Sequence, residues 1–164
     1  MLPVVAGCSS GTKAPTAHVA AHSEFAGDLS FTGEISVRGK FTDGLTTRGE
    51  RCTAYAHALA PATTLWVVPT PNNAETVAGH IVFYTAGVVA ATPSGDYHGP
   101  GSYSGANALI SELTIDNASF VADAKTSATI IVDSDGAGSL SFRNLVDTST
   151  FALEAGKVTW RCAG

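Results

Sequence analysis

Hydrophobic and polar residues alternate along most of the chain, from about Glu24 to the last residue. Glycine, proline, aspartate and asparagine, which favour turns, interrupt the alternation at short intervals. A period of two residues predicts β-strands with one buried and one solvent-facing side. Many short strands predict an all-β domain, which we interpret as an immunoglobulin-like antiparallel β-sandwich, with a small β-barrel as the alternative.

Two segments carry the clearest strand signals. Apolar residues alternate with polar ones over residues 128–142, on both sides of a turn-forming segment at 133–138, which predicts a hairpin. In the last predicted strand Val158, Trp160 and Cys162 share one face. Weaker patterns predict a strand from Cys52 to about His57, turns at Gly39 and at 43–44, a central strand over 77–84, a bulge at Asn117 and one or two helical turns within 106–112.

The composition narrows the classes of function. The chain has 164 residues, a length that fits one domain, and no apolar run is long enough for a membrane-spanning helix. Its net charge is −5, with nine lysines and arginines against fourteen aspartates and glutamates. Because nucleic-acid binding needs a strongly basic protein surface, we expect no nucleic-acid partner.

The segment Val5-Ala6-Gly7-Cys8 resembles the lipobox of bacterial lipoproteins. The resemblance implies that the leader is cleaved before Cys8 and that the sulfur of Cys8 carries a lipid. Residues 1–7 would then be the remainder of a leader. Residues 8–23, rich in small and polar side chains, would be a flexible tether to a β-sandwich domain at 24–164.

A broader resemblance covers the chain from about Gly27 to its end. The order of its turn and strand-end motifs is similar to that of small exported lipoproteins of actinobacteria, and distantly to the mycobacterial small lipoprotein antigens. The motifs are residues 27–33, a strand with a cysteine, 97–103, 135–140 and 156–162. This resemblance implies an architecture and a location in the bacterial cell envelope, on the outer face of the membrane, but no activity.

The two cysteines that remain after Cys8 are expected to form a disulfide. Cys52 and Cys162 would meet an oxidising compartment in an exported protein, where such a pair normally bridges. A zinc site is disfavoured because neither residue has a C-x-x-C spacing or several nearby histidines. A catalytic thiol is disfavoured because no histidine lies in the segment of Cys162.

Several short motifs match catalytic or metal-binding patterns but have a simpler interpretation. Residues 7–11 match G-x-S-x-G, yet that motif needs a strand before it and a helix after it. Asp133 and Asp135 are spaced as in a calcium loop, but their strand-like flanks favour a plain turn. His18 and His22 have no third ligand nearby, and His80 is expected to be a sheet residue.

The remaining candidate is a ligand-binding shelf formed by Tyr97, His98 and Tyr103 around a glycine-proline turn. Tyrosines packed against their own loop are the alternative. We find no catalytic residues, metal ligands or cofactor motif, so we expect a non-catalytic surface module that binds a small molecule, a glycan or a protein. A small envelope hydrolase or metal-dependent enzyme, with a site assembled from distant loops, is the alternative.

Overall fold

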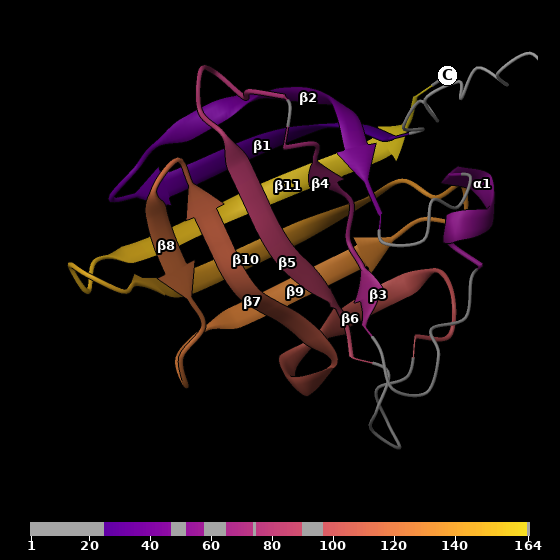
Figure 1. Ribbon diagram of the computed structural model, residues 1–164. Coiled ribbons are helices and arrows are strands. Elements are labelled where there is room, and N and C mark those ends of the chain that lie inside the picture. Colours follow the sequence, from indigo (N-terminus) through magenta and orange to yellow (C-terminus); the bar gives the residue numbers. More distant parts are fainter. Residues whose placement is uncertain (1–24, 47–51, 58–64, 74, 90–96, 164) are drawn as a thin grey trace, which may run out of the picture.

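The computed structural model describes residues 25–46, 52–57, 65–73, 75–89 and 97–163 (Figure 1). The predictions for the leader, the tether, Cys8, His18 and His22 lie outside the described residues.

All strands within the described residues belong to one antiparallel sheet, which curls into a half-barrel (Figure 1). The all-β prediction is confirmed. The continuous sheet is closer to the barrel alternative than to the two separate sheets of an immunoglobulin-like sandwich. The strands are β1 (Phe25–Gly33), β2 (Val37–Leu45), β3 (Trp66–Val67), β4 (Thr70–Pro71), β5 (Val82–Val88), β6 (Gly101–Ser104), β7 (Ala108–Ile115), β8 (Ala118–Val121), β9 (Ser127–Val132), β10 (Gly138–Asp147) and β11 (Leu153–Cys162).

The order of the strands is β3-β5-β7-β8-β10-β11-β1-β2-β4, with β9 pairing β10 and β6 beside this path. The sheet branches at β10, where the register shifts between Phe142 and Leu145 and Asn144 has a φ of 60°. The first part of β10 pairs with β9 and its last two residues pair with β8. A bulge of this kind bends and twists a strand, which favours a curled sheet.

One short segment links the two edges of the curled sheet. Residues 66–71 contain β3, which pairs with β5, and β4, which pairs with β2. The Thr70 hydroxyl accepts a hydrogen bond of 3.3 Å from the Tyr84 backbone N–H, and the Val68 N–H donates to the Ala86 carbonyl at 2.9 Å. The segment therefore runs along the open side of the half-barrel.

The core fills the concave side of the sheet, where the inward positions of the strands meet. The predicted hairpin is confirmed, because Ile130 lies opposite Leu140 and Ala128 lies opposite Phe142. The predicted face of the last strand is also confirmed, since Val158 and Trp160 are buried. The largest fully buried side chains are Tyr84, Phe25, Phe31, Phe41, Phe120, Leu29, Ile110, Leu113, Ile115, Ile130, Leu140 and Leu145.

The prediction of a strand from Cys52 to His57 is wrong, because Cys52–Tyr55 is a short helix, α1. Cys52, Tyr55 and Ala56 are buried at positions i, i+3 and i+4, the spacing of one helix face. Small residues lie between these buried positions, so the sequence also fitted the alternating pattern of a strand. The predicted turns at Gly39 and 43–44 are wrong as well, since β2 continues through both, with a shift in its pairing register between Phe41 and Gly44.

Three further predictions are corrected. The segment 77–84 is a turn followed by the start of β5, and its apolar residues fall on both faces because Val77 enters the core from that turn. The phase slip at Asn117 marks a two-residue hairpin turn, since Ile115 pairs directly with Ala118. The helical segment is limited to the 3-10 turn Gly105–Asn107, after which β7 begins.

Candidate functional site

The outward side of the sheet carries two rows of mostly polar residues that run across the strands. In an antiparallel sheet, residues in register on neighbouring strands point to the same side and lie about 5 Å apart. The first row consists of Arg38, Ser30, Lys157, Ser141, Thr129 and Ser104, on β2, β1, β11, β10, β9 and β6. The second row consists of Lys40, Asp28, Thr159, Ser139, Ile131 and Ser102 on the same strands.

These two rows, together with Arg143 and Arg161 beside them, are called here the hydroxyl–cation face. Each of its side chains is exposed or half-buried. Their outward orientation follows from the alternation, because Val37 and Phe41 of β2 point inward on either side of Arg38 and Lys40. Across six strands a row extends roughly 24 Å. This length exceeds that of a single sugar ring or phosphate group.

Positive charge is concentrated on this face although the chain is acidic. The described part of the chain contains six lysines and arginines, and five of them, all except Lys125, lie on the hydroxyl–cation face. Asp28 is the one carboxylate in the two rows, and its Oδ2 lies 3.5 Å from Nη1 of Arg161. The two rows hold three cations and one carboxylate, and two further arginines lie beside them, so the local field favours anions.

The face is hollowed at two neighbouring places. A shallow depression of about 490 Å³ is lined by Asp28, Leu29, Ser30, Arg38, Gly39, Lys40, Lys157 and Thr159. A smaller one, of about 180 Å³, is lined by Ser127, Ala128, Thr129, Ser141, Phe142 and Arg143. Guanidinium, ammonium and hydroxyl groups can donate hydrogen bonds to carboxylate, phosphate and hydroxyl oxygens. The arrangement is suited to binding an anionic, hydroxyl-rich ligand.

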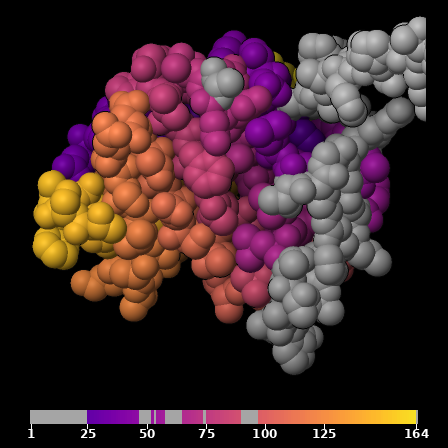
Figure 2. Space-filling model, in the orientation of Figure 1, coloured from indigo at the N-terminus to yellow at the C-terminus, as the bar shows by residue number. Residues whose placement is uncertain are grey.

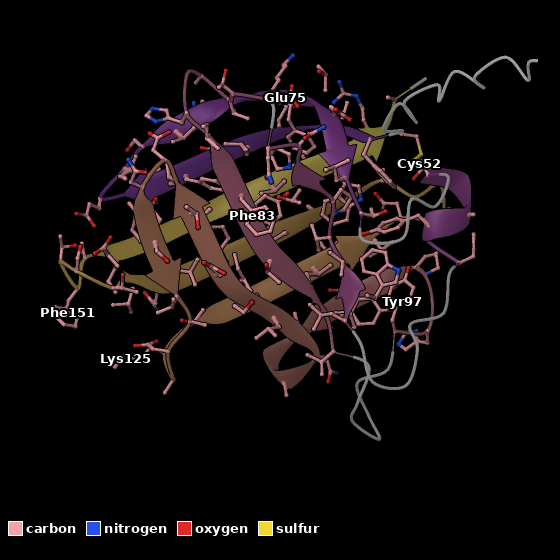
Figure 3. All side chains as sticks on the ribbon, in the orientation of Figure 1. Cys52, Glu75, Phe83, Tyr97, Lys125 and Phe151 are labelled. Atoms are coloured by element: carbon pink, nitrogen blue, oxygen red, sulfur yellow. A yellow bond between two sulfur atoms is a disulfide. The ribbon has the colours of Figure 1, made fainter. Side chains whose placement is uncertain are left out.

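The predicted shelf residues do lie together, at the end of the sheet that carries the disulfide (Figure 3). The rings of Tyr97 and Tyr103 have centroids 5.5 Å apart, and both residues are only 3% exposed. The Tyr97 hydroxyl donates a 2.6 Å hydrogen bond to the Ala56 carbonyl, and the Tyr103 hydroxyl donates to the Gly99 carbonyl. Burial raises the pKa of both phenols, with the Tyr103 phenol adding to the effect at Tyr97. The arrangement matches packed loop tyrosines rather than an open shelf.

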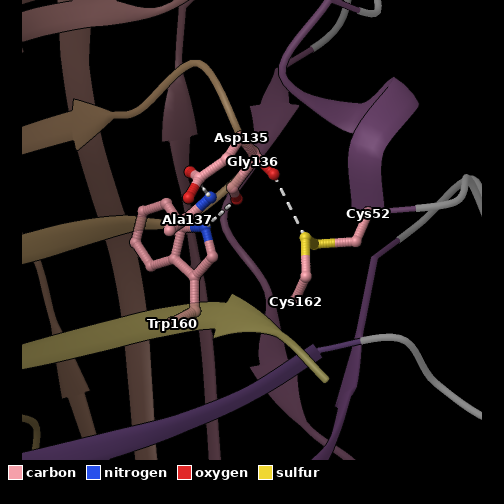
Figure 4. The surroundings of a disulfide bond; sticks show 6 residues. All are labelled: Cys52, Asp135, Gly136, Ala137, Trp160 and Cys162. Atoms are coloured by element: carbon pink, nitrogen blue, oxygen red, sulfur yellow. Dashed lines mark hydrogen bonds between the residues drawn. A yellow bond between two sulfur atoms is a disulfide. The ribbon is translucent and has the colours of Figure 1, made fainter. Parts of the chain in front are cut away.

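The predicted disulfide is present. Cys52 of α1 is bonded to Cys162 at the end of β11, with Cα atoms 5.5 Å apart (Figure 4). The β9–β10 turn packs against this bond, since the Asp135 carbonyl oxygen lies 3.1 Å from the Cys162 sulfur. The Trp160 indole N–H donates to the Gly136 carbonyl at 3.0 Å. The disulfide thus links α1 to the end of β11, and the β9–β10 turn packs against the bond.

The turn at 133–138 has the hydrogen bonds of a plain turn. The Gly136 N–H donates to the Asp133 carbonyl at 3.1 Å, and Oδ1 of Asp135 accepts the Ala137 N–H at 3.0 Å. Over the described ranges, no three histidine, cysteine, aspartate or glutamate side chains are grouped to hold a metal ion.

His80 is in a turn rather than inside a strand. Its Nδ1 lies 2.8 Å from Oδ2 of Asp116, whose Oδ1 accepts the Ile81 N–H at 2.9 Å. The His80 hydrogen bond, followed by the one from Ile81, lowers the pKa of the Asp116 carboxyl. Both side chains are partly exposed. The pair fixes this turn against the β7–β8 turn.

The alternation in the last strand, with Val158, Trp160 and Cys162 on one face, puts Lys157, Thr159 and Arg161 on the other face. It did not indicate that Arg38 and Lys40 lie beside them, because that proximity depends on the pairing of β1 with both β2 and β11. The signal available in the sequence was that Arg38 and Lys40 alternate with uncharged residues in one segment, which puts both cations on one face of a strand.

No protein-family model, curated protein or solved structure matches this chain. Within the described residues, none of the helices is long and apolar enough to cross a membrane.

Proposed function

We propose that the domain is a non-catalytic binding module of the bacterial cell envelope, and that its hydroxyl–cation face binds an anionic polysaccharide. The observation that carries the proposal is the concentration of five cations, three in the two rows and two beside them, with a series of hydroxyls on one regular sheet surface. A rigid sheet places these donors at fixed spacings, so that little conformational entropy is lost on binding.

The shape of the face favours a polymer over a small anion. A row crosses six strands and is shallow along its length, whereas sites for small molecules enclose most of the ligand surface. Carboxylate- or phosphate-bearing sugar polymers combine repeated negative charges with many hydroxyl groups, which matches the alternation of Arg38, Ser30, Lys157 and Ser141.

Binding to defined polymers tests the proposal. Polygalacturonate and polyglycerol phosphate serve as carboxylate and phosphate probes, and dextran serves as the neutral control, in affinity electrophoresis at low salt. We expect Lys157→Glu to weaken binding of at least one anionic polymer by about tenfold, and added salt to weaken wild-type binding. Lys125→Glu, which changes the net charge equally but lies off the face, should change binding less than twofold. Equal losses in the two variants, or equal binding of dextran, would contradict the proposal.

We further propose that Cys8 carries a lipid that holds the module on the outer face of the membrane. The support is the lipobox-like segment and the small-residue sequence after it. Two or more acyl chains give stable anchoring where one chain is marginal. Metabolic labelling with an alkyne fatty acid, from the gene with its upstream sequence, should label wild type and not Cys8→Ala. Equal labelling of both would refute this anchor.

A further inference from the structure

A carboxylate lies among the cations of the larger depression on the hydroxyl–cation face. Asp28 of β1 lies directly opposite Lys40 of β2 and Thr159 of β11, and all three residues line the depression. Within the described part of the chain, the Asp28 side chain has one ion pair, in which its Oδ2 lies 3.5 Å from Nη1 of Arg161. The side chain is 49% exposed, so Oδ1 can accept hydrogen bonds from a ligand in the depression.

Two cations of the same depression lie on either side of a serine close to Asp28. Ser30, two residues further along β1, has Arg38 of β2 on one side and Lys157 of β11 on the other. Residues two apart on one face of a strand are separated by roughly 7 Å, and neighbouring strands by about 5 Å. A single sugar residue can span these distances, with its acid group against Arg38 or Lys157 and its hydroxyl groups at Asp28.

A carboxylate in this position distinguishes two kinds of anionic polymer. The hydroxyl groups of a sugar can donate hydrogen bonds to the carboxylate oxygens, and a hydrogen bond to a charged acceptor is stronger than one between neutral groups. A polymer that carries acid groups but no hydroxyls has no such donor, and Asp28 repels its charges. Binding proteins gain specificity from repulsive elements of this kind as well as from attractive contacts.

On the basis of the polysaccharide binding proposed above, we infer that Asp28 is a specificity-determining residue of the hydroxyl–cation face. It selects anionic polymers that have free hydroxyl groups over those that have none. The five cations attract any polyanion, whereas Asp28 favours a polyanion built of sugars.

Two matched pairs of polymers test this selectivity. Polygalacturonate is compared with polyacrylate, and polyglycerol phosphate with inorganic polyphosphate, so that each pair shares its acid group and differs in its hydroxyls. Affinity electrophoresis at low salt gives the dissociation constants of the full chain and of Asp28→Asn. We expect Asp28→Asn to tighten binding of the hydroxyl-free polymer and to reduce the preference for its hydroxyl-bearing counterpart, measured as the ratio of the two constants, by at least about fivefold.

Two control variants separate the role of Asp28 from general charge and from its ion pair. Glu112→Gln removes the same charge from β7, which with β5 lies on the side of the molecule shown in Figure 2, whereas β1 and β11 lie behind them (Figure 1). It should change the ratio by less than about twofold. Arg161→Gln removes the partner of Asp28 but keeps the carboxylate, so it should weaken both members of a pair alike. A reduced ratio in Arg161→Gln would show that Asp28 acts only by holding Arg161.

The result for the ratio does not depend on the stability of the variant. Exposed ion pairs contribute little to stability, so the Tm of Asp28→Asn should be close to that of wild type, and partial unfolding would weaken binding of both polymers alike. An unchanged ratio in Asp28→Asn, with wild-type binding of a hydroxyl-bearing polymer, would overturn the selectivity and leave the proposed function standing. Absence of wild-type binding to both hydroxyl-bearing polymers would overturn both.

Discussion

Glu154 is a carboxylate in the core, on the inward face of the last strand. It is 1% exposed, its Oε2 accepts the Ile35 N–H at 3.3 Å, and its Oε1 has no hydrogen-bond partner in the described part of the chain. Burial raises the pKa of this carboxyl, against the opposing effect of hydrogen bonds from the N–H groups of Ile35 and Glu34. The folded protein therefore holds this proton to a higher pH than the unfolded chain does.

The Glu154 pKa predicts how stability depends on pH. Because the folded-state pKa exceeds the unfolded value of about 4.3, stability should fall as the pH rises from that value through the folded pKa. Glu154→Gln removes this charge, so its Tm should exceed that of wild type by a few degrees at neutral pH and converge with it near pH 4. Thermal melts between pH 4 and 8 measure the difference. Glu112→Gln, at an exposed position, is the control, and parallel pH profiles for wild type and Glu154→Gln would contradict the prediction.

Gly136 combines a positive φ with a close backbone contact. Its φ is 91°, and a Cβ atom added there would lie 2.3 Å from the Cys52 carbonyl oxygen. Gly136→Ala should lower the free energy of unfolding by at least about 3 kcal/mol, because the helix backbone must shift. Gly105 has a φ of 61° with nothing within 4 Å of its added Cβ, so Gly105→Ala should lose only about 1–2 kcal/mol. Urea titrations compare the two variants, and equal losses would show that the Cys52 contact does not matter.

At the scale of elements, sequence prediction succeeded where large apolar side chains alternate. The hairpin of β9 and β10 and the inward face of β11 were predicted because Ile130, Leu140 and Trp160 identify a face without ambiguity. Around Cys52, small residues separate the buried positions, so strand and helix spacings could not be distinguished. The turn at 77–80 was missed because Ala78 has a φ of 51°, a conformation that alanine seldom signals.

Asp147 determines the stability of the β10–β11 loop toward acid. The hydrogen bond from the Ser149 hydroxyl, followed by those from the N–H groups of Thr150 and Ser149, lowers the pKa of Asp147 to about 2. The ionised Asp147 carboxylate contributes fully to stability above its unfolded-state pKa of about 3.9. This contribution is lost as the pH falls toward 2. We expect Asp147→Ala to lower Tm by several degrees at pH 7 and by less at pH 2. Asp123→Ala, in another turn, is the comparison, and a pH-independent effect of Asp147→Ala would argue against this role.

At the scale of the whole molecule, the order and curl of the sheet were beyond sequence reasoning. The hydroxyl–cation face requires Arg38 and Lys157 on either side of Ser30, and these residues are far apart in the chain. Their proximity depends on closing long loops, about which local alternation carries no information. The disulfide was predicted because an expected export and the two cysteines that remain after Cys8 point to it. The packing of a helix and a turn around the bond was not predicted.

The Cys52–Cys162 bond ties the end of the last strand to the helix that follows β2, across a sequence separation of 110 residues. For a loop of this length the chain-entropy model gives a stabilisation of about 4–5 kcal/mol. A domain of this size has roughly 5–15 kcal/mol in all, and each 1 kcal/mol moves its Tm by about 2–8 °C. Cys52→Ala/Cys162→Ala should therefore lower Tm by well over ten degrees in thermal melts.

The chemical state of the two sulfurs is checked separately, by non-reducing peptide mapping of protein isolated from its native cells. Because the β9–β10 turn and Trp160 pack at this bond, we expect the linked peptides to persist under mild reduction that leaves the fold intact. Free thiols at both positions in this protein would contradict the bond itself. A double variant that melts within a few degrees of wild type would instead show that the β11 strand is held by its pairing with β1 and β10, and that the bond adds little to it.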